Sequence, residues 1–430
     1  MEIFGIILAL LLLCFVCFKG MSPLWAAPIC AILVAATNGL PVFDSFAGTY
    51  MQGFAGFAQG YLMIFLLGGI FGKMMELTGA AAAIGEIVVK LVGKKRAILA
   101  VILACAIMTY GGISLFIVMF VIYPIAAAAF RESNIPRQLF PGAYAVGCYT
   151  FTMTGLPGSP QIQNLIPIEY FGTTAMAAPV LGVICSILLF GIGFCWMTYR
   201  EKKMVKQGLG WTENPKDVAS GVYDAPKMNK VLAFLPLITV VVVLNLFGMD
   251  ATISLTAGIF VNMICSIKLV SSDKMLKTMN EGAVSSLQIS LVTAAVVGFG
   301  SVVKSTATFN SLADSVFGLP ISPLLIVVIA VNILAGICGS ASGGMSIALS
   351  VLGDRIIALS QSTGIPLSVF HRITSLSSGG LDTLPPGVVA LLDYCGCTYK
   401  ESYIDIFVTS VLTPIVVALI GVVLASLGVY

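Results

Sequence analysis

The chain carries two versions of one series of short motifs, and this duplication limits its fold more than any other feature. Five markers in the first half return in the same order in the second half, offset by about 228 residues. The matched segments are Gly20-Met21 and Gly248-Met249, the runs from Gly72 and Gly300, GGIS at Gly111 and GGMS at Gly343, GLPGSP at Gly155 and LDTLPPG at Leu381, and EYFG at Glu169 and DYCG at Asp393. A chance resemblance would not keep five markers in order, so two structural repeats are expected.

The composition places these repeats in a membrane. Hydrophobic residues make up 58% of the chain and charged residues only 10%, whereas a soluble domain carries about 25% charged residues. Apolar runs such as Ile3–Phe18, Val231–Phe247 and Phe407–Leu427 approach the roughly 20 residues of a membrane-spanning helix. We therefore expect an all-α polytopic membrane protein.

Each repeat is expected to contain about five crossings and one re-entrant hairpin. In the first repeat, 1–200, the crossings are 3–18, 22–39, 56–75, 138–168 and 174–198, with an amphipathic stretch at 80–92 and a hairpin at 97–130. In the second, 231–430, they are 231–247, 253–270, 284–303, 366–392 and 403–428, with a hairpin at 321–355. Because five is odd, the second repeat should be inverted relative to the first.

The distribution of positive charge predicts the orientation. The central linker, 201–230, is the one long polar segment and is rich in Lys and Arg. With this linker in the cytoplasm, only Lys304, Arg355 and Arg372 of the 22 basic residues fall outside, as the positive-inside rule favours. We expect a multi-pass protein of the bacterial inner (plasma) membrane with both termini outside.

Four Gly-, Pro- and Ser-rich clusters interrupt the apolar pattern at membrane depth. Two are the hairpin tips, and two break the fourth crossing of each repeat. Non-helical backbone at this depth is tolerated only around a cavity or inside protein. Each cluster exposes the amides of a following half-helix, which favour an anion. A packing kink or a small-residue helix contact is the alternative for each cluster.

The four clusters supply the candidate substrate-binding residues. They are Gly111, Gly112, Ser114, Thr154, Gly158, Ser159, Gln161, Gln163, Asn164, Ser340, Ser342, Gly343, Gly344, Ser378, Gly379 and Thr383. Together they would form a pocket that binds a small organic anion without a fixed cation.

Two ionisable residues of the second broken crossing are candidates for proton coupling. Asp382 lies within the break, where a carboxylate is costly and usually functional; a capping role toward the turn at 385–387 is the alternative. His371, the only histidine, could relay a proton or, with Arg372, lie at the membrane interface. Glu169 and Asp393 are interpreted as surface capping carboxylates.

Other ligands have no support in the sequence. Most cysteines lie in apolar runs as small hydrophobic residues, and the single pair Cys395-x-Cys397 is a poor metal site. We expect no metal, no cofactor and no nucleic acid partner.

The ordered motifs resemble the gluconate permease family of proton symporters, within the wider ion transporter superfamily. The resemblance rests on FKGMSPLWA from Phe18, the segment from Leu67 to Ala97, SNIP at Ser133, ISPLL at Ile321 and GSASGG at Gly339. It implies a homodimer with elevator-type movement. The scaffold would be 1–92 and 231–318, the mobile hairpins and broken helices 97–168 and 321–392, with crossings at 174–198 and 403–428.

The breaks depart from that family's pattern. Gluconate carriers have a His- and Pro-rich first break and a His-Val-Asn-Asp run in the second, where this chain has TGLPGSPQIQN and GGLDTLPPG. The first break is more similar to the 3-hydroxybutyrate permease branch. We therefore expect proton symport of a short hydroxy or keto monocarboxylate, with gluconate or a related sugar acid as the alternative.

Two other classes of protein also have features in common with this sequence. An anion channel also uses re-entrant loops, but its filter usually repeats around a pore axis, and these clusters differ chemically. An intramembrane aspartyl protease needs two carboxylates in the membrane, and Asp382 lacks a partner there. The chain is not expected to be an enzyme.

Overall fold

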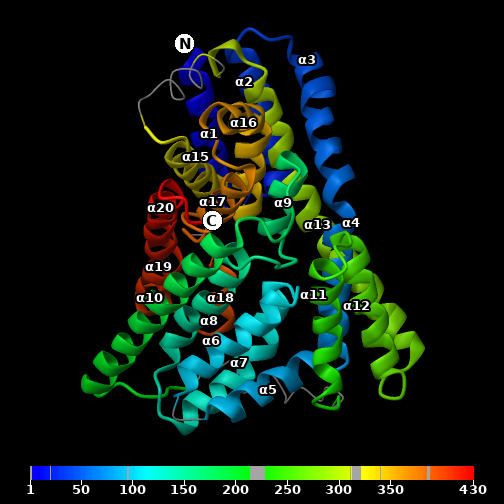
Figure 1. Cartoon of the computed structure of the whole chain (residues 1–430), viewed down its shortest axis with the longest axis vertical. Coiled ribbons are helices and arrows are strands. Elements are labelled where there is room, and N and C mark those ends of the chain that lie inside the picture. Colours follow the sequence, from blue (N-terminus) through cyan, green and yellow to red (C-terminus); the bar gives the residue numbers. More distant parts are fainter. Residues whose placement is uncertain are drawn as a thin grey trace.

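The computed structural model describes residues 2–19, 21–93, 96–213, 228–309, 311, 321–338, 340–384 and 388–430. Every regular element in these ranges is helical, which confirms the all-α class (Figure 1). The middle of the linker (214–227), the end of the second expected scaffold segment (312–318) and the turn at 385–387 lie outside them.

In the first half, two helices precede a long one, and a helical pair and a broken crossing follow. These are α1 (Glu2–Phe18), α2 (Pro23–Thr37), α3 (Val42–Asp44), α4 (Met51–Leu77), α5 (Ala80–Val92), α6 (Ala97–Tyr110), α7 (Leu115–Glu132), α8 (Phe140–Cys148), α9 (Ile162–Phe171) and α10 (Pro179–Lys206). A π-helical segment, Phe151–Gly155, follows α8, and residues 156–161 between it and α9 are not helical.

In the described part of the second half, two shorter helices again precede a long one, and a helical pair and four shorter helices follow. These are α11 (Leu235–Asn245), α12 (Ala251–Ser266), α13 (Ser272–Lys304), α15 (Pro323–Cys338), α16 (Ala341–Thr363), α17 (Leu367–Ser378), α18 (Val389–Tyr394), α19 (Tyr399–Phe407) and α20 (Thr413–Ser426). A π-helical segment, Val408–Leu412, joins α19 to α20.

The long helices α4 and α13 form the most extensive helix pair of the molecule. They approach closely because, where they cross, each helix presents a glycine to the other. A Cβ on Gly69 would lie 2.7 Å from the Gly282 carbonyl oxygen, and one on Gly282 would lie 2.8 Å from the Ile70 Cα. Around this pair, α2 packs on α13 and α12 packs on α4.

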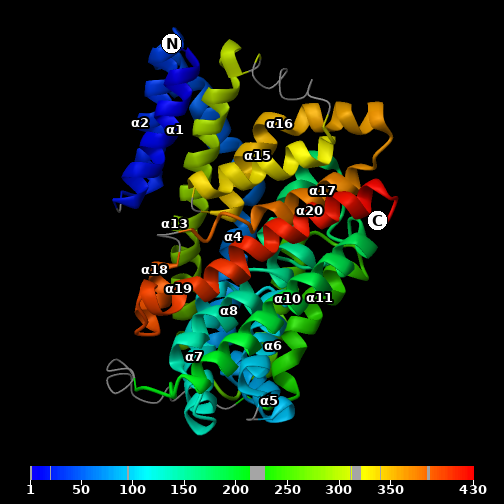
Figure 2. The same cartoon turned by 90° about the vertical axis from the view of Figure 1, so that its left-hand side faces the viewer.

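The remaining helices surround this frame in two groups. Figure 2 shows α15, α16, α17 and α20 extending to one side of α1 and α2, while α5 and α7 lie at the opposite end of the molecule. Within these groups α6 packs on α7 and α8, and α15 packs on α16 and α17.

Helix length and surface chemistry identify an integral membrane protein. Among the described residues, five helical segments are long and apolar enough to cross a membrane. Large apolar side chains face outward; Leu246, Ile264 and Val284 are 80%, 70% and 69% exposed. A soluble protein rarely exposes such large apolar surfaces, but a bilayer covers them.

The observed helices match the predicted segments best where the helix ends at the same residue as the apolar run. The amphipathic stretch 80–92 is α5. By contrast, α10 continues to Lys206, α13 begins at Ser272 and α16 continues to Thr363, each beyond the predicted bounds. Charged and polar residues propagate a helix outside the apolar layer, so hydropathy marks only part of it. At 23 residues, α16 is long enough to cross a membrane, so its length alone does not identify a hairpin arm.

Candidate substrate-binding site

One cavity of about 420 Å³ lies where the four clusters meet α4, α12 and α13. Each cluster contributes to its wall: Gly112 and Ser114 from the first hairpin tip, Gln161 and Gln163 from the first break, Ser340 and Ser342 from the second tip, and Asp382 and Thr383 from the second break. The structure thus brings together eight of the eighteen predicted site residues, which lie far apart in the sequence.

The first tip and the first break are bonded to each other. The Gln161 side-chain amide donates to the Thr109 carbonyl (2.6 Å), and the Tyr110 hydroxyl donates to the Pro157 carbonyl (3.0 Å). Gly112 has φ +94°, and a Cβ there would lie 3.1 Å from Pro160. The tip therefore needs glycine at Gly112, both for its backbone angle and for its approach to the break.

The second tip and the second break are each packed closely against another segment. Ser340 caps α16, because its hydroxyl accepts from the Gly343 amide at 3.2 Å. A Cβ on Gly344 would lie 2.2 Å from Ala335 of α15. Across the break, the Thr383 hydroxyl contacts the Ser410 hydroxyl at 3.0 Å. Gly343 and Gly344 therefore shape the hairpin without lining the cavity.

Three helix N-termini in the cavity wall favour an anion. Ser114, Gln161 and Ser340 precede the first residues of α7, α9 and α16 and line the cavity. Three helix N-termini, with their partial positive charges, are therefore directed to one space. None of the described residues in its wall is Lys, Arg or His.

Two acceptor atoms in the cavity wall have no hydrogen-bond partner in the described structure. One is Oδ1 of Asp382, and the other is Oε1 of Gln163, whose side chain is only 6% exposed. Buried polar atoms are nearly always bonded. These two oxygens are therefore the positions where a proton or a ligand hydroxyl would complete the site.

The remaining predicted residues lie behind the cavity wall rather than in it. The Thr154 carbonyl accepts from the Ser375 hydroxyl (2.8 Å), and the Ser378 hydroxyl donates to the Ser375 carbonyl (2.7 Å). Gly379 packs against Thr154, and a Cβ on Gly111 would meet Leu237 of α11 at 2.4 Å. These residues hold the clusters in place.

Asn164 is the centre of a buried network behind the first break. Its amide donates to the carbonyls of Ser159 (2.9 Å) and Ala175 (3.0 Å). Its oxygen accepts from Arg372 (3.0 Å) and contacts Nε2 of His371 (3.3 Å). The Gly158 amide donates to the same Ala175 carbonyl at 2.8 Å. Asn164 thus fixes the break and does not face the cavity.

His371 and Arg372 are enclosed by protein on all sides, and their place at the membrane interface stays a prediction. Neither side chain has any exposed surface. The sequence placed them near a helix end, but the chain packs α17 between α9, α15 and α20. Nδ1 of His371 contacts the Thr173 hydroxyl at 2.7 Å, so both ring nitrogens have partners within the protein.

The sequence analysis missed the walls supplied by unbroken helices. Tyr149 and Met153 border the first break, and most of the other lining side chains outside the predicted set come from α4, α7, α9, α12, α13 and α16. The apolar ones include Ile64, Phe65, Leu115, Ile162, Leu255, Ile289 and Val292, and Gln288 adds an amide. A regular apolar helix gives no local signal of which side chains face a cavity.

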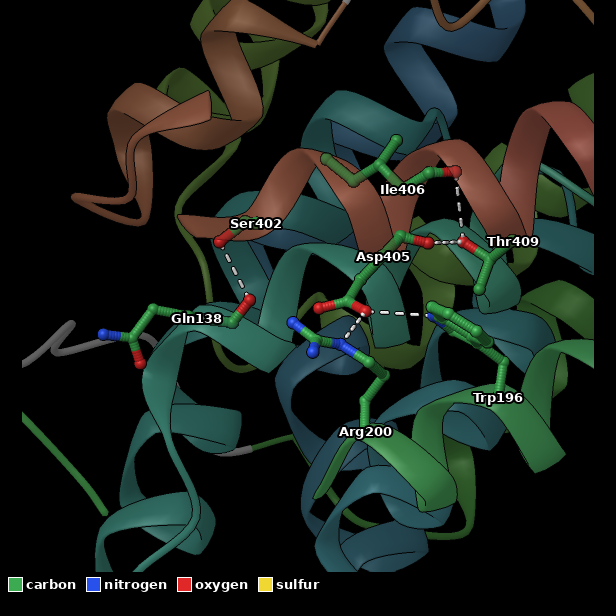
Figure 3. A network of polar contacts seen from close by, with 7 residues as sticks. All are labelled: Gln138, Trp196, Arg200, Ser402, Asp405, Ile406 and Thr409. Carbon is green, nitrogen blue, oxygen red and sulfur yellow. Dashed lines mark hydrogen bonds and ion pairs between the residues drawn. The ribbon is translucent and has the colours of Figure 1, made fainter. Parts of the chain in front are cut away.

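A second polar network lies outside the cavity, between α10 and α19 (Figure 3). Oδ1 of Asp405 accepts from Arg200 Nε at 2.6 Å and from the Trp196 indole at 2.9 Å. The Asp405 side chain is fully buried, and that of Arg200 is 15% exposed. From the sequence, Arg200 was counted only among the basic residues of the cytoplasmic side, whereas it pairs with a buried carboxylate.

Glu169, the acidic residue after the first break, does not line this cavity. Glu169 is exposed on α9, which agrees with its interpretation as a surface residue. The side chain of Asp393 lies outside the described part of the chain.

Comparison with known proteins assigns the family. The sequence model of the GntP family permeases matches residues 1–246. A Bacillus subtilis protein named "Uncharacterized transporter YxjC" is 38% identical over 98% of both chains. The chain belongs to the GntP permease family.

More distant comparisons agree with a membrane transporter. An "Uncharacterized permease" of Haemophilus influenzae is 22% identical to this permease over 88% of the chain and 82% of its own length. In fold, the permease is similar to the Alcanivorax borkumensis YdaH transporter, whose crystal structure is described as revealing an unusual topology. The TM-score is 0.62 with 16% identity, over 90% of this chain and 89% of the other. These relatives support a transporter rather than an enzyme.

Proposed function

We propose that this permease is a proton-coupled symporter of short hydroxy or keto monocarboxylates such as 3-hydroxybutyrate. The observation that carries the proposal is the cavity itself. It combines three helix N-termini, an unpartnered carboxylate oxygen at Asp382 and no basic side chain among its described residues. Such a site can attract a carboxylate and still release it, because no ion pair must be broken.

The lining supports a small, partly apolar substrate. The hydroxyl and amide groups gather at the clusters, while α4, α12 and α13 contribute mainly apolar walls, among them Phe65, Leu255 and Val292. A carboxylate and one hydroxyl can be satisfied at the clusters while a short alkyl tail contacts the apolar side. Gluconate carries a hydroxyl on almost every carbon and would leave several of them against apolar walls; it is the second candidate.

Asp382 is the proposed proton carrier. It lines the cavity and its Oδ1 has a free acceptor position in the described structure. His371 suits the role less well. The Asn164 oxygen can only accept, so Nε2 carries the hydrogen and Nδ1 accepts from Thr173. This neutral tautomer satisfies both contacts, and protonation would place a second cation beside Arg372.

We further propose an inverted repeat with an elevator movement. The element order of the two halves and the reciprocal packing of α2 on α13 and of α12 on α4 support the repeat. In this scheme 1–92 and 231–318 form the scaffold, and 97–168 and 321–392 carry the substrate. The cavity lies between these parts, where a sliding movement would expose it to either side. A homodimer held by the scaffold completes the proposal.

A binding screen tests the proposed substrate class. Purified protein would be heated with a series of acids: 3-hydroxybutyrate, lactate, acetoacetate, butyrate and gluconate. A ligand that binds only the folded state raises stability by about 2.7 kcal/mol at 100 times its Kd. We expect 3-hydroxybutyrate and its short relatives to raise the Tm more than gluconate does. A larger shift with gluconate would favour the sugar-acid alternative, and no shift with any acid would contradict the proposal.

A further inference from the structure

Arg372 on α17 is a buried cation without a counter-charge in the described structure. Its side chain is fully buried, and its guanidinium donates only to neutral oxygens. These are Oδ1 of Asn164 (3.0 Å) and the carbonyls of Ala175 (3.3 Å) and Ala177 (2.9 and 3.1 Å). Buried charges are usually paired, because an isolated one is costly.

The titratable groups that face Arg372 do not supply the missing charge. They are His371 on its own helix, Tyr110 on α6 and Cys185 on α10. A phenol, a thiol and an imidazole carry no negative charge at neutral pH. Arg200, by contrast, has the buried carboxylate of Asp405 at 2.6 Å.

Arg372 lies one side chain behind the cavity wall. It donates to Asn164, whose amide donates to the Ser159 carbonyl (2.9 Å), and the next residues, Pro160 and Gln161, line the cavity. Along its own helix, Arg372 lies six residues before the end of α17, which is about 9 Å along the helix axis. The break that carries Asp382 begins there.

We propose that Arg372 is the buried counter-charge of the transported anion, and that Asp382 balances the same charge while the cavity is empty. The inference rests on the proton-coupled function proposed above. In the empty carrier, ionised Asp382 offsets Arg372. When a carboxylate binds, it takes over that role and Asp382 takes up one proton. One anion and one proton enter together, so the net charge of the site does not change.

This exchange of counter-charges explains why neither ligand should move alone. If the anion bound without the proton, the anion and ionised Asp382 would both be negative, with only Arg372 to balance them. If the proton bound without the anion, the charge of Arg372 would have no counter-charge. A unit charge about 12 Å away, at an effective dielectric constant near 20, changes a binding constant about tenfold. Removing the charge of Arg372 should therefore weaken anion binding about tenfold.

The test measures affinity and proton uptake together. Purified full-length protein in weakly buffered detergent would be mixed with 3-hydroxybutyrate, with calorimetry for affinity and a pH indicator for protons. We expect wild type to take up close to one proton per anion. Arg372→Gln should bind about tenfold more weakly and take up almost none, because Asp382 is already protonated. Arg372→Lys keeps the charge but not the fork of hydrogen bonds, and should still take up the proton.

A second pair of variants leaves Arg372 and its hydrogen bonds in place. Cys185→Asp puts a carboxylate beside the guanidinium and should abolish proton uptake as Arg372→Gln does. Cys185→Asn adds a side chain of the same size without charge and should behave as wild type. This pair keeps the inference testable if Arg372→Gln does not fold.

The possible results distinguish a failure of the counter-charge role of Arg372 from a failure of proton coupling itself. If wild type takes up a proton and Arg372→Gln or Cys185→Asp does so equally, Arg372 is not the counter-charge. Equal losses in Arg372→Lys and Arg372→Gln would mean that Arg372 only positions the break. A wild type that binds the anion without taking up a proton would overturn proton coupling itself, and this inference with it.

Discussion

Two glutamines of the first break differ in whether their side chains already have partners. Gln161 donates to the Thr109 carbonyl at 2.6 Å and so ties the break to the first hairpin tip. Gln163 lines the same cavity, but its Oε1 has no partner in the described structure. Gln161 therefore shapes the site, and Gln163 is available to recognise a substrate hydroxyl.

Replacing Gln163 should change selectivity rather than binding in general. One neutral hydrogen bond is worth about 1 kcal/mol. We expect Gln163→Leu to bind 3-hydroxybutyrate about fivefold more weakly and butyrate, which lacks the hydroxyl, as well as wild type does. Gln161→Leu is the matched control and should weaken both acids alike. Equal losses for both acids in Gln163→Leu would remove its role in hydroxyl recognition.

The Arg200–Asp405 pair should matter for stability and not for substrate choice. Removing one partner of a buried pair is costly, and water reaching the 15% exposed Arg200 reduces that cost. We expect Asp405→Asn to destabilise the protein by about 2 kcal/mol, seen as a lower Tm, with unchanged ratios of affinity among acids. Asp354→Asn, in the exposed pair with Lys304, should leave the Tm almost unchanged. An altered preference among acids would contradict this assignment.

Local chemistry predicted some of these residues and not others. Asp382 and Gln163 could be found because polar side chains next to a helix break have few roles other than binding or capping. Gln288 lies on the regular helix α13 and Tyr149 in the turn after α8, and only the packing brings them to the cavity. The burial of His371 and Arg372 depends on how α17 is enclosed, which no local pattern encodes.

At the scale of elements, the hairpin tips depend on close backbone approach. Gly112 has φ +94° and lies against Pro160, and a Cβ on Gly344 would overlap the Ala335 backbone. Both hairpins thus use glycine where an arm meets its neighbour. The sequence pattern assigned these glycines to the substrate site, and the structure shows that Gly112 and Gly344 also pack closely against a neighbouring segment.

Alanine at these glycines should disturb the hairpins. Gly112→Ala forces a positive φ on an L residue, which costs about 1–3 kcal/mol, and Gly344→Ala requires the arms to separate. We expect both variants to lose thermal stability and substrate affinity. Gly56→Ala on α4, where a Cβ meets nothing within 4 Å, is the control and should match wild type. Wild-type affinity in Gly112→Ala and Gly344→Ala would contradict the close approach.

For the whole molecule, the proposed inverted repeat predicts on which side of the membrane the termini and the linker lie. Five crossings before the linker and five after it place both termini on the side opposite the linker. We expect a membrane-impermeant thiol reagent to label a cysteine added after Tyr430 in intact cells, but not one at Lys203. The native cysteines would be replaced by alanine or serine beforehand. Labelling of Lys203→Cys from outside, or an inaccessible C-terminus, would contradict this topology.

The central claim is that Asp382 couples a proton to the movement of a small organic anion. Its most direct test is uptake of labelled 3-hydroxybutyrate into proteoliposomes with an imposed pH gradient. We expect wild type to accumulate the acid above equilibrium, and Asp382→Asn to exchange internal for external acid while losing accumulation. Full accumulation by Asp382→Asn would contradict the account, and current that does not saturate with substrate would show a channel.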